Sequence, residues 1–141
     1  MKYITGAIAL NIPWSLDTTG DWHRLSIDWS KMKLADTKDS IFGTWGIEEG
    51  IYIPELDGSY NVANTIRACL DLIDAKIFYQ ASCMNKDYIA NDKYDDIVIE
   101  KEYELKAIKT QEEWDRIDTF MRKEYLLKWA NFNNDKNVWL F

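Results

Sequence analysis

The chain has 141 residues, of which 47% are hydrophobic and 14% aromatic, and its formal net charge is −7. This composition is typical of a folded protein the size of one domain and excludes disorder as the default state. Acidic residues number 24 against 17 basic ones. Direct binding to DNA or RNA is therefore not expected, because neutralising phosphates requires a basic surface.

Thiols and imidazoles are scarce. Cys69, Cys83 and the single histidine, His23, are too few for a disulfide framework or a zinc site, so we expect no metal and no cofactor. The N-terminal residues lack the features of a secretory signal, and no stretch reaches the roughly 18 apolar residues that a membrane span needs. These features predict a cytoplasmic protein that does not contact the membrane.

The first third of the chain has the alternation and turn residues of a β-sheet. Residues 3–12 predict one strand and residues 25–29 a second. Residues 41–54 predict a β-hairpin with its turn at Glu48-Glu49-Gly50. We therefore expect an antiparallel sheet of about four strands within residues 1–55.

A long apolar periodicity follows and predicts a helix across the sheet. Apolar residues recur at steps of three and four at Val62, Ile66, Cys69, Leu70, Ile73 and Ile77. Ser59 or Asn61 is the expected cap. Arg67 is expected on the solvent-facing side; a surface or interface ion pair with Asp71, four residues on, is favoured over a role in holding a phosphate.

The remaining chain predicts more helix. Residues 95–108 fit a helix capped by Asp95 or Asp96 or, through their Ile-Val-Ile run, a strand; the Glu and Lys content favours the helix. Thr110 and Glu113 predict a capping box. A buried stripe follows it, made of Trp114, Ile117, Met121 and Tyr125.

The C-terminus predicts a turn-forming tail over residues 131–137 and a short strand over residues 138–141 that pairs within the chain or in a homo-oligomer. The whole chain is expected to be one α+β domain, 1–141. Residues 1–55 are mainly β and residues 60–130 mainly helical, with the helices packed on the sheet.

Asp21 and His23 form the one candidate catalytic pair. They follow a predicted strand, where active residues are common, and a carboxylate beside an imidazole suits acid–base chemistry. The structural alternative is favoured: the aspartate caps a turn and the histidine bonds a backbone group.

A second candidate site is the acidic window 87–104, in which seven carboxylates stand against Lys93 and Lys101. Its candidate partner-binding residues are Asp92, Asp95, Asp96, Glu100, Glu102 and Glu104. A solvated helix face is the simpler interpretation, and an acidic surface that occupies a basic groove is the functional one. Trp14 and Trp22, in or beside loops, are the expected aromatic anchors for such a partner.

Several strings resemble those of small bacterial proteins without established activity that tend to be encoded near toxin–antitoxin or phage-defence genes. The strings are TGAIALNIP (5–13), LDTTGDWH (16–23), SIFGTWGIE (40–48), VANTIRACLDLI (62–73) and WDRIDTFMRKEY (114–125). The resemblance spans most of the chain and implies a neutraliser of another protein. It transfers no catalytic residue.

Together these features predict a non-enzymatic, acidic, protein-binding protein that is antitoxin-like or inhibitor-like. Its expected target is a nucleic-acid-handling protein with a basic surface, such as a nuclease or nucleotidyltransferase, in a toxin–antitoxin, phage-defence or counter-defence (anti-CRISPR-type) system. The alternative is a small hydrolase or nuclease that uses Asp21 and His23.

Overall fold

The computed structural model describes residues 1–12, 27–89 and 91–138. The chain is 60% helical and 15% strand, so the α+β class is confirmed at this level. The four-stranded sheet is wrong, because the described strands form two separate two-stranded antiparallel sheets, β1–β2 and β3–β4. The chain divides into two compact units, residues 1–80 and 81–141, and each is described by itself.

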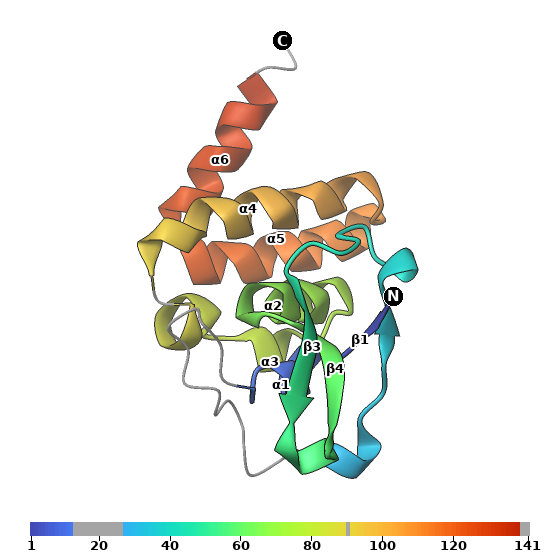
Figure 1. Cartoon of the computed structure of the whole chain (residues 1–141). Coiled ribbons are helices and arrows are strands. Elements are labelled where there is room, and N and C mark those ends of the chain that lie inside the picture. The colour runs from blue at the N-terminus through green and yellow to red at the C-terminus, as the bar shows by residue number, and fades with distance from the viewer. Residues whose placement is uncertain (13–26, 90, 139–141) are drawn as a thin grey trace. The chain divides into compact units, whose positions relative to one another are not determined.

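The first unit holds the four strands of the described residues, together with α1 and α2 (Figure 1). Its strands are β1 (Lys2–Tyr3), β2 (Ala35–Asp36), β3 (Ile47–Ile53) and β4 (Gly58–Ala63). Its α-helices are α1 (Gly6–Ala9) and α2 (Thr65–Asp74), and the last residue of α3 (Phe78–Ala81) is the first of the second unit. Its short 3-10 helices are Trp29–Lys31, Thr37–Asp39 and Pro54–Leu56.

The second unit is entirely helical in its described part. Its α-helices are α4 (Asp95–Tyr103), α5 (Gln111–Tyr125) and α6 (Leu127–Val138). A π-helical turn, Met84–Tyr88, precedes them, and 3-10 turns at Asp92–Tyr94 and Glu104–Ala107 extend α4 at both ends.

Of the strand predicted over residues 3–12, Tyr3 lies in β1 and Ile4 forms an isolated parallel bridge with Val62, and the prediction is wrong beyond Ile4. The backbone turns at Gly6, whose φ of +67° favours glycine, and α1 begins there. The core of this segment then includes Ala9 as well as Leu10 and Ile12, so its buried residues do not share one parity. Of the strand predicted over residues 25–29, the described part is extended at Asp28 and begins a 3-10 helix at Trp29.

The predicted hairpin exists, but its turn lies elsewhere. Residues 48–50 lie inside β3, where a register shift after Glu48 marks a bulge and Gly50 takes a φ of +68°. The chain reverses at Pro54–Leu56 and Asp57, and β4 pairs back antiparallel. Residues 55–61, which have loop composition, therefore supply most of the second strand.

The helix α2 forms the centre of the first unit. Its cap is the side chain of Asn64, which accepts a hydrogen bond from the backbone N–H of Arg67, so the predicted caps Ser59 and Asn61 are wrong. Val62 lies in β4 rather than in the helix. Eight of the ten residues of α2 are buried, including Cys69 as predicted, because α1 and β4 pack against it.

The helices of the second unit meet through aromatic rings. Tyr103 of α4 contacts Trp114 of α5 edge-on, with ring centroids 5.8 Å apart, and Phe132 of α6 at 5.3 Å. The predicted helix at 95–108 is confirmed as α4 and its 3-10 extension, although Tyr94 is its N-cap and Asp95 and Asp96 lie in its first turn. The capping box of Thr110 and Glu113 is also confirmed.

The predicted turn-forming tail at 131–137 is wrong, because these residues belong to α6. The side-chain amide of Asn133 donates to the carbonyl of Trp129, one turn back, at 2.9 Å. Buried Trp129 anchors the helix, so tertiary packing overrides the turn preference of asparagine. Val138 ends α6; the rest of the strand predicted at 138–141 lies outside the described residues.

We expect Gly46→Ala to destabilise the first unit far more than Gly43→Ala. Both glycines have a positive φ, so either alanine costs about 1–2 kcal/mol of strain. At Gly46 an added Cβ lies 2.8 Å from Cβ of Arg67, whereas at Gly43 it meets nothing within 4 Å. The clash adds about 1–3 kcal/mol at Gly46. Urea unfolding measures the difference, and equal losses would contradict it.

Candidate protein-binding surface

The acidic window forms a strip on the second unit. Asp92, Asp96, Glu100 and Glu104 are all exposed. Their four-residue spacing along α4 and its 3-10 extensions places neighbouring carboxylates on one side of the helix. We call these four residues the acidic strip.

Two acids predicted to face a partner do not reach the surface. Asp95 is 3% exposed and Glu102 is 0% exposed. The helix geometry explains the difference, because Val98, Ile99 and Glu102 share the inward side of α4 with Asp95. The prediction that Asp95 and Glu102 bind a partner is therefore wrong, and the other four acids remain candidates.

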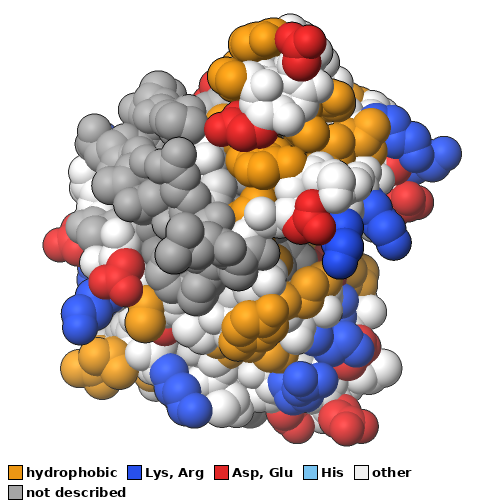
Figure 2. Space-filling view, turned by 90° about the horizontal axis from the view of Figure 1, so that it is seen from below, with side chains coloured by type: hydrophobic (Ala, Val, Ile, Leu, Met, Phe, Trp, Pro, Cys, Tyr) orange, Lys and Arg blue, Asp and Glu red, His pale blue; other side chains and the backbone are white. Residues whose placement is uncertain are grey.

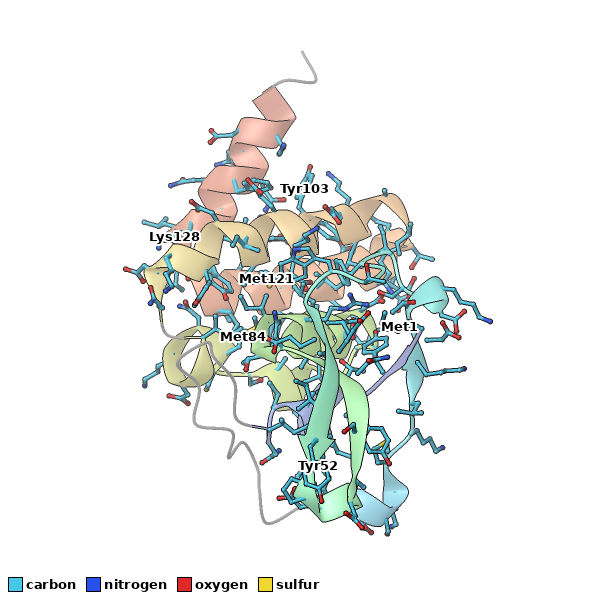
Figure 3. All side chains as sticks on the ribbon, viewed as in Figure 1. Met1, Tyr52, Met84, Tyr103, Met121 and Lys128 are labelled. Atoms are coloured by element: carbon cyan, nitrogen blue, oxygen red, sulfur yellow. The ribbon has the colours of Figure 1, made fainter. Side chains whose placement is uncertain are left out.

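Asp95 instead joins the start of α4 to the start of α6. Its carboxylate accepts a hydrogen bond from Nζ of Lys128, which lies at that end of the helices (Figure 3). This hydrogen bond, together with the nearby charges of Asp92 and Asp96, raises the pKa of Lys128. The ammonium group is thus held beside the first two members of the acidic strip.

The charges of the acidic strip partly destabilise the helix that carries them. Asp96 lies in the first turn of α4, where the helix dipole favours a negative charge. Like charges four residues apart, however, destabilise a helix by about 0.2–0.5 kcal/mol per pair. Lysines moderate this repulsion at both ends of the strip, since Lys128 lies near Asp92 and Asp96 and Lys101 lies 3.8 Å from Glu104.

Sequence reasoning missed the apolar residues beside the acidic strip. Ile97 is exposed between Asp96 and Glu100, and Leu126 and Leu127 are exposed between α5 and α6. The sequence contains one indication of their exposure: both leucines come directly after Tyr125, the last residue of the buried stripe of α5. On the face drawn in Figure 2, hydrophobic side chains also form patches bordered by charges of both signs.

Arg67 lies at the centre of a hydrogen-bond network in the first unit. It is 0% exposed, and its Nε donates to Oδ1 of Asp71 at 2.9 Å. The i,i+4 pair with Asp71 is therefore present, but the predicted solvent-facing position of Arg67 is wrong. The guanidinium also donates to the carbonyls of Gly43 and Trp45 and, at 3.0 Å, to the Tyr3 hydroxyl.

Two partners of Arg67, Tyr3 and Asp71, are also bonded to each other. The hydroxyls of Tyr3 and Thr5 both donate to Oδ2 of Asp71 at 2.7 Å. Burial, together with the charge of Asp71, raises the pKa of Tyr3 far above its ordinary value. The three guanidinium nitrogens of Arg67 and the two hydroxyls thus each donate to an acceptor within the fold. This arrangement suits a structural role, because the network joins β1, α2 and the turn at residues 43–45.

An acidic cleft of about 350 Å³ lies beside this network in the first unit. Its charged lining residues are Lys2, Asp36, Asp39, Asp71 and Asp74. Asp36 is held by the backbone N–H of Lys38, by Lys2 and by the N-terminal amine, which lower its pKa to about 2. Among the described residues, no group of three or more His, Cys, Asp or Glu side chains is placed to hold a metal.

The remaining predicted site residues fall outside the described part of the chain. These are the aromatic anchors Trp14 and Trp22 and the acid–base pair Asp21 and His23. The acidic strip is therefore the predicted site for which the structure gives a geometry.

No protein-family model, curated protein or solved structure matches this chain. No helix within the described ranges is both long and apolar enough to span a bilayer.

Proposed function

We propose that this protein binds another protein through the acidic strip and thereby inhibits it. The observation that supports the proposal is the exposure of Asp92, Asp96, Glu100 and Glu104 along one side of α4. Repeated like charge is unfavourable within the helix and becomes favourable against a basic surface. The partner is therefore a protein with a groove or patch of Lys and Arg.

Nucleic-acid-handling proteins are the partner class that fits this chemistry, because their working surfaces are basic. A strip of carboxylates occupies such a surface in place of phosphates. A nuclease or nucleotidyltransferase neutralised in a toxin–antitoxin, phage-defence or anti-CRISPR-type setting agrees with the resemblance of the sequence strings. The free thiols Cys69 and Cys83 fit a reducing compartment such as the cytoplasm.

The test compares two variants of identical charge. The strip variant carries Asp92→Asn, Asp96→Asn, Glu100→Gln and Glu104→Gln. The control variant neutralises four exposed acids elsewhere, Glu49→Gln, Glu55→Gln, Glu112→Gln and Asp135→Asn. Each changes the net charge from −7 to −3, so a difference between them reports position rather than total charge.

We expect the wild-type protein to recover a stoichiometric basic protein from cells of its host. The purified partner should bind the strip variant at least tenfold more weakly at low salt, mainly through a slower association rate. The control variant should bind within a factor of about three of wild type, since distant exposed charges are screened. Failure to recover any stoichiometric partner, or equal binding by both variants, would count against the proposal.

A further inference from the structure

The corner between α5 and α6 exposes two consecutive leucines. Leu126 is 67% exposed and Leu127 is 74% exposed, which makes Leu127 the most exposed large apolar side chain in the described part of the chain. Single exposed apolar residues are common on protein surfaces, whereas contiguous exposed apolar patches mark interaction sites. The corner therefore merits a functional explanation.

The backbone at this corner is held in a conformation that leucine rarely adopts. Leu126 has a φ of 49° and a ψ of −124°, a positive-φ conformation that glycine adopts readily and residues with a Cβ rarely do. Its N–H donates to the carbonyl of Arg122 at 3.0 Å, and its own carbonyl accepts from Ala130 at 3.2 Å. Because the side chain is exposed, its burial in the free protein does not offset this strain.

The corner lies at one end of the acidic strip. Lys128, the residue after Leu127, is bonded to Asp95 and lies within electrostatic reach of Asp92 and Asp96. Ile97, three residues before Glu100 in α4, adds an exposed apolar side chain beside the strip. From Asp92 to Glu104 the strip extends over about 18 Å, which is slightly more than three helical turns.

We propose that Leu126 and Leu127 are the apolar anchor of the acidic strip, and that together they bind a basic amphipathic helix of the partner protein. Lysines or arginines at every fourth residue of such a helix repeat at the spacing of the acids of the strip. Its apolar face covers the two leucines. A second copy of this chain fits poorly, because two acidic strips repel each other. This inference depends on the proposed function and adds the shape and chemistry of the bound element.

The test uses two defined probes. One is an 18-residue helical peptide of leucine and lysine with one apolar and one basic face, and the other is poly-L-lysine, which has the charge alone. The corner variant is Leu126→Gly with Leu127→Ser, and the matched control is Tyr79→Ser, at an equally exposed residue of the first unit. Binding is measured by calorimetry, and circular dichroism checks folding.

We expect the wild-type protein to bind the amphipathic peptide more tightly than poly-L-lysine. The corner variant should lose at least tenfold in affinity for the peptide and keep its affinity for poly-L-lysine, and Tyr79→Ser should change neither. A loss below twofold in the corner variant would overturn the anchor while leaving the proposed function intact. Absence of binding to both probes would contradict the acidic strip as well. A wild-type dimer that the corner variant dissociates would assign the leucines to self-association instead.

Discussion

Replacement of Arg67 by methionine is expected to lower the free energy of unfolding by about 3–5 kcal/mol, although methionine fills much of the same space. The loss arises because the acceptors around the guanidinium are partly buried and lose their donor when it is removed. The carboxylate of Asp71, whose side chain is 11% exposed, loses its cation, and the carbonyls of Gly43 and Trp45 lose a donor. Chemical denaturation measures the loss, and amide hydrogen exchange should locate it in residues 1–80.

The control for this prediction removes the charges of both members of the ion pair, Arg67 and Asp71. Asp71→Asn alone leaves the buried guanidinium without its anion, so it should also destabilise the unit. The double variant Arg67→Met with Asp71→Asn should be more stable than the sum of the single losses implies, with a coupling of about 1–3 kcal/mol. Strict additivity, or a loss below about 1 kcal/mol for Arg67→Met, would show that the network does not hold β1, α2 and the turn at 43–45 together.

The sequence predicts the helices of this fold better than its strands. The capping box at Thr110 and the stripe that begins at Trp114 are local signals, and α5 follows them. The strands depend on features that a local pattern does not carry. Gly6 turns the chain into α1, and Gly50 bends β3 without ending it, although both glycines fit a strand or a hairpin turn from the sequence.

The candidate-site residues also divide into those that local spacing predicts and those whose burial depends on packing. The four-residue spacing of Asp96 and Glu100 within α4 predicts that they share a face, whereas Asp92 and Glu104 lie in the 3-10 turns that flank the helix. Burial of Asp95 and Glu102 depends on which side of α4 packs against the rest of its unit. Arg67 shows the same limit, since an arginine next to Asp71 at i+4 is typical of a solvent-facing pair, and only the fold brings Tyr3 and the 43–45 carbonyls to it.

The helix α6 is the clearest case of tertiary packing that overrides local composition, and Trp129 is the residue on which it depends. Its indole is 0% exposed, its Nε1 donates to Asp118 of α5 at 2.8 Å, and its ring lies 5.9 Å from that of Trp114. The asparagine-rich sequence that follows has weak helix propensity of its own. Contacts made by Trp129 therefore hold the start of this helix against α5.

We accordingly expect Trp129→Ala to cost about 3–5 kcal/mol and to uncouple α6 from α5. Circular dichroism should show a loss of helix, and hydrogen exchange should show faster exchange across residues 127–138. Leu127→Ala is the matched control, because it removes an exposed apolar side chain from the same helix and should change stability by less than about 0.5 kcal/mol. If Trp129→Ala leaves exchange in α6 unchanged, the helix is held by its own propensity, and the corner that presents Leu126 and Leu127 does not depend on this packing.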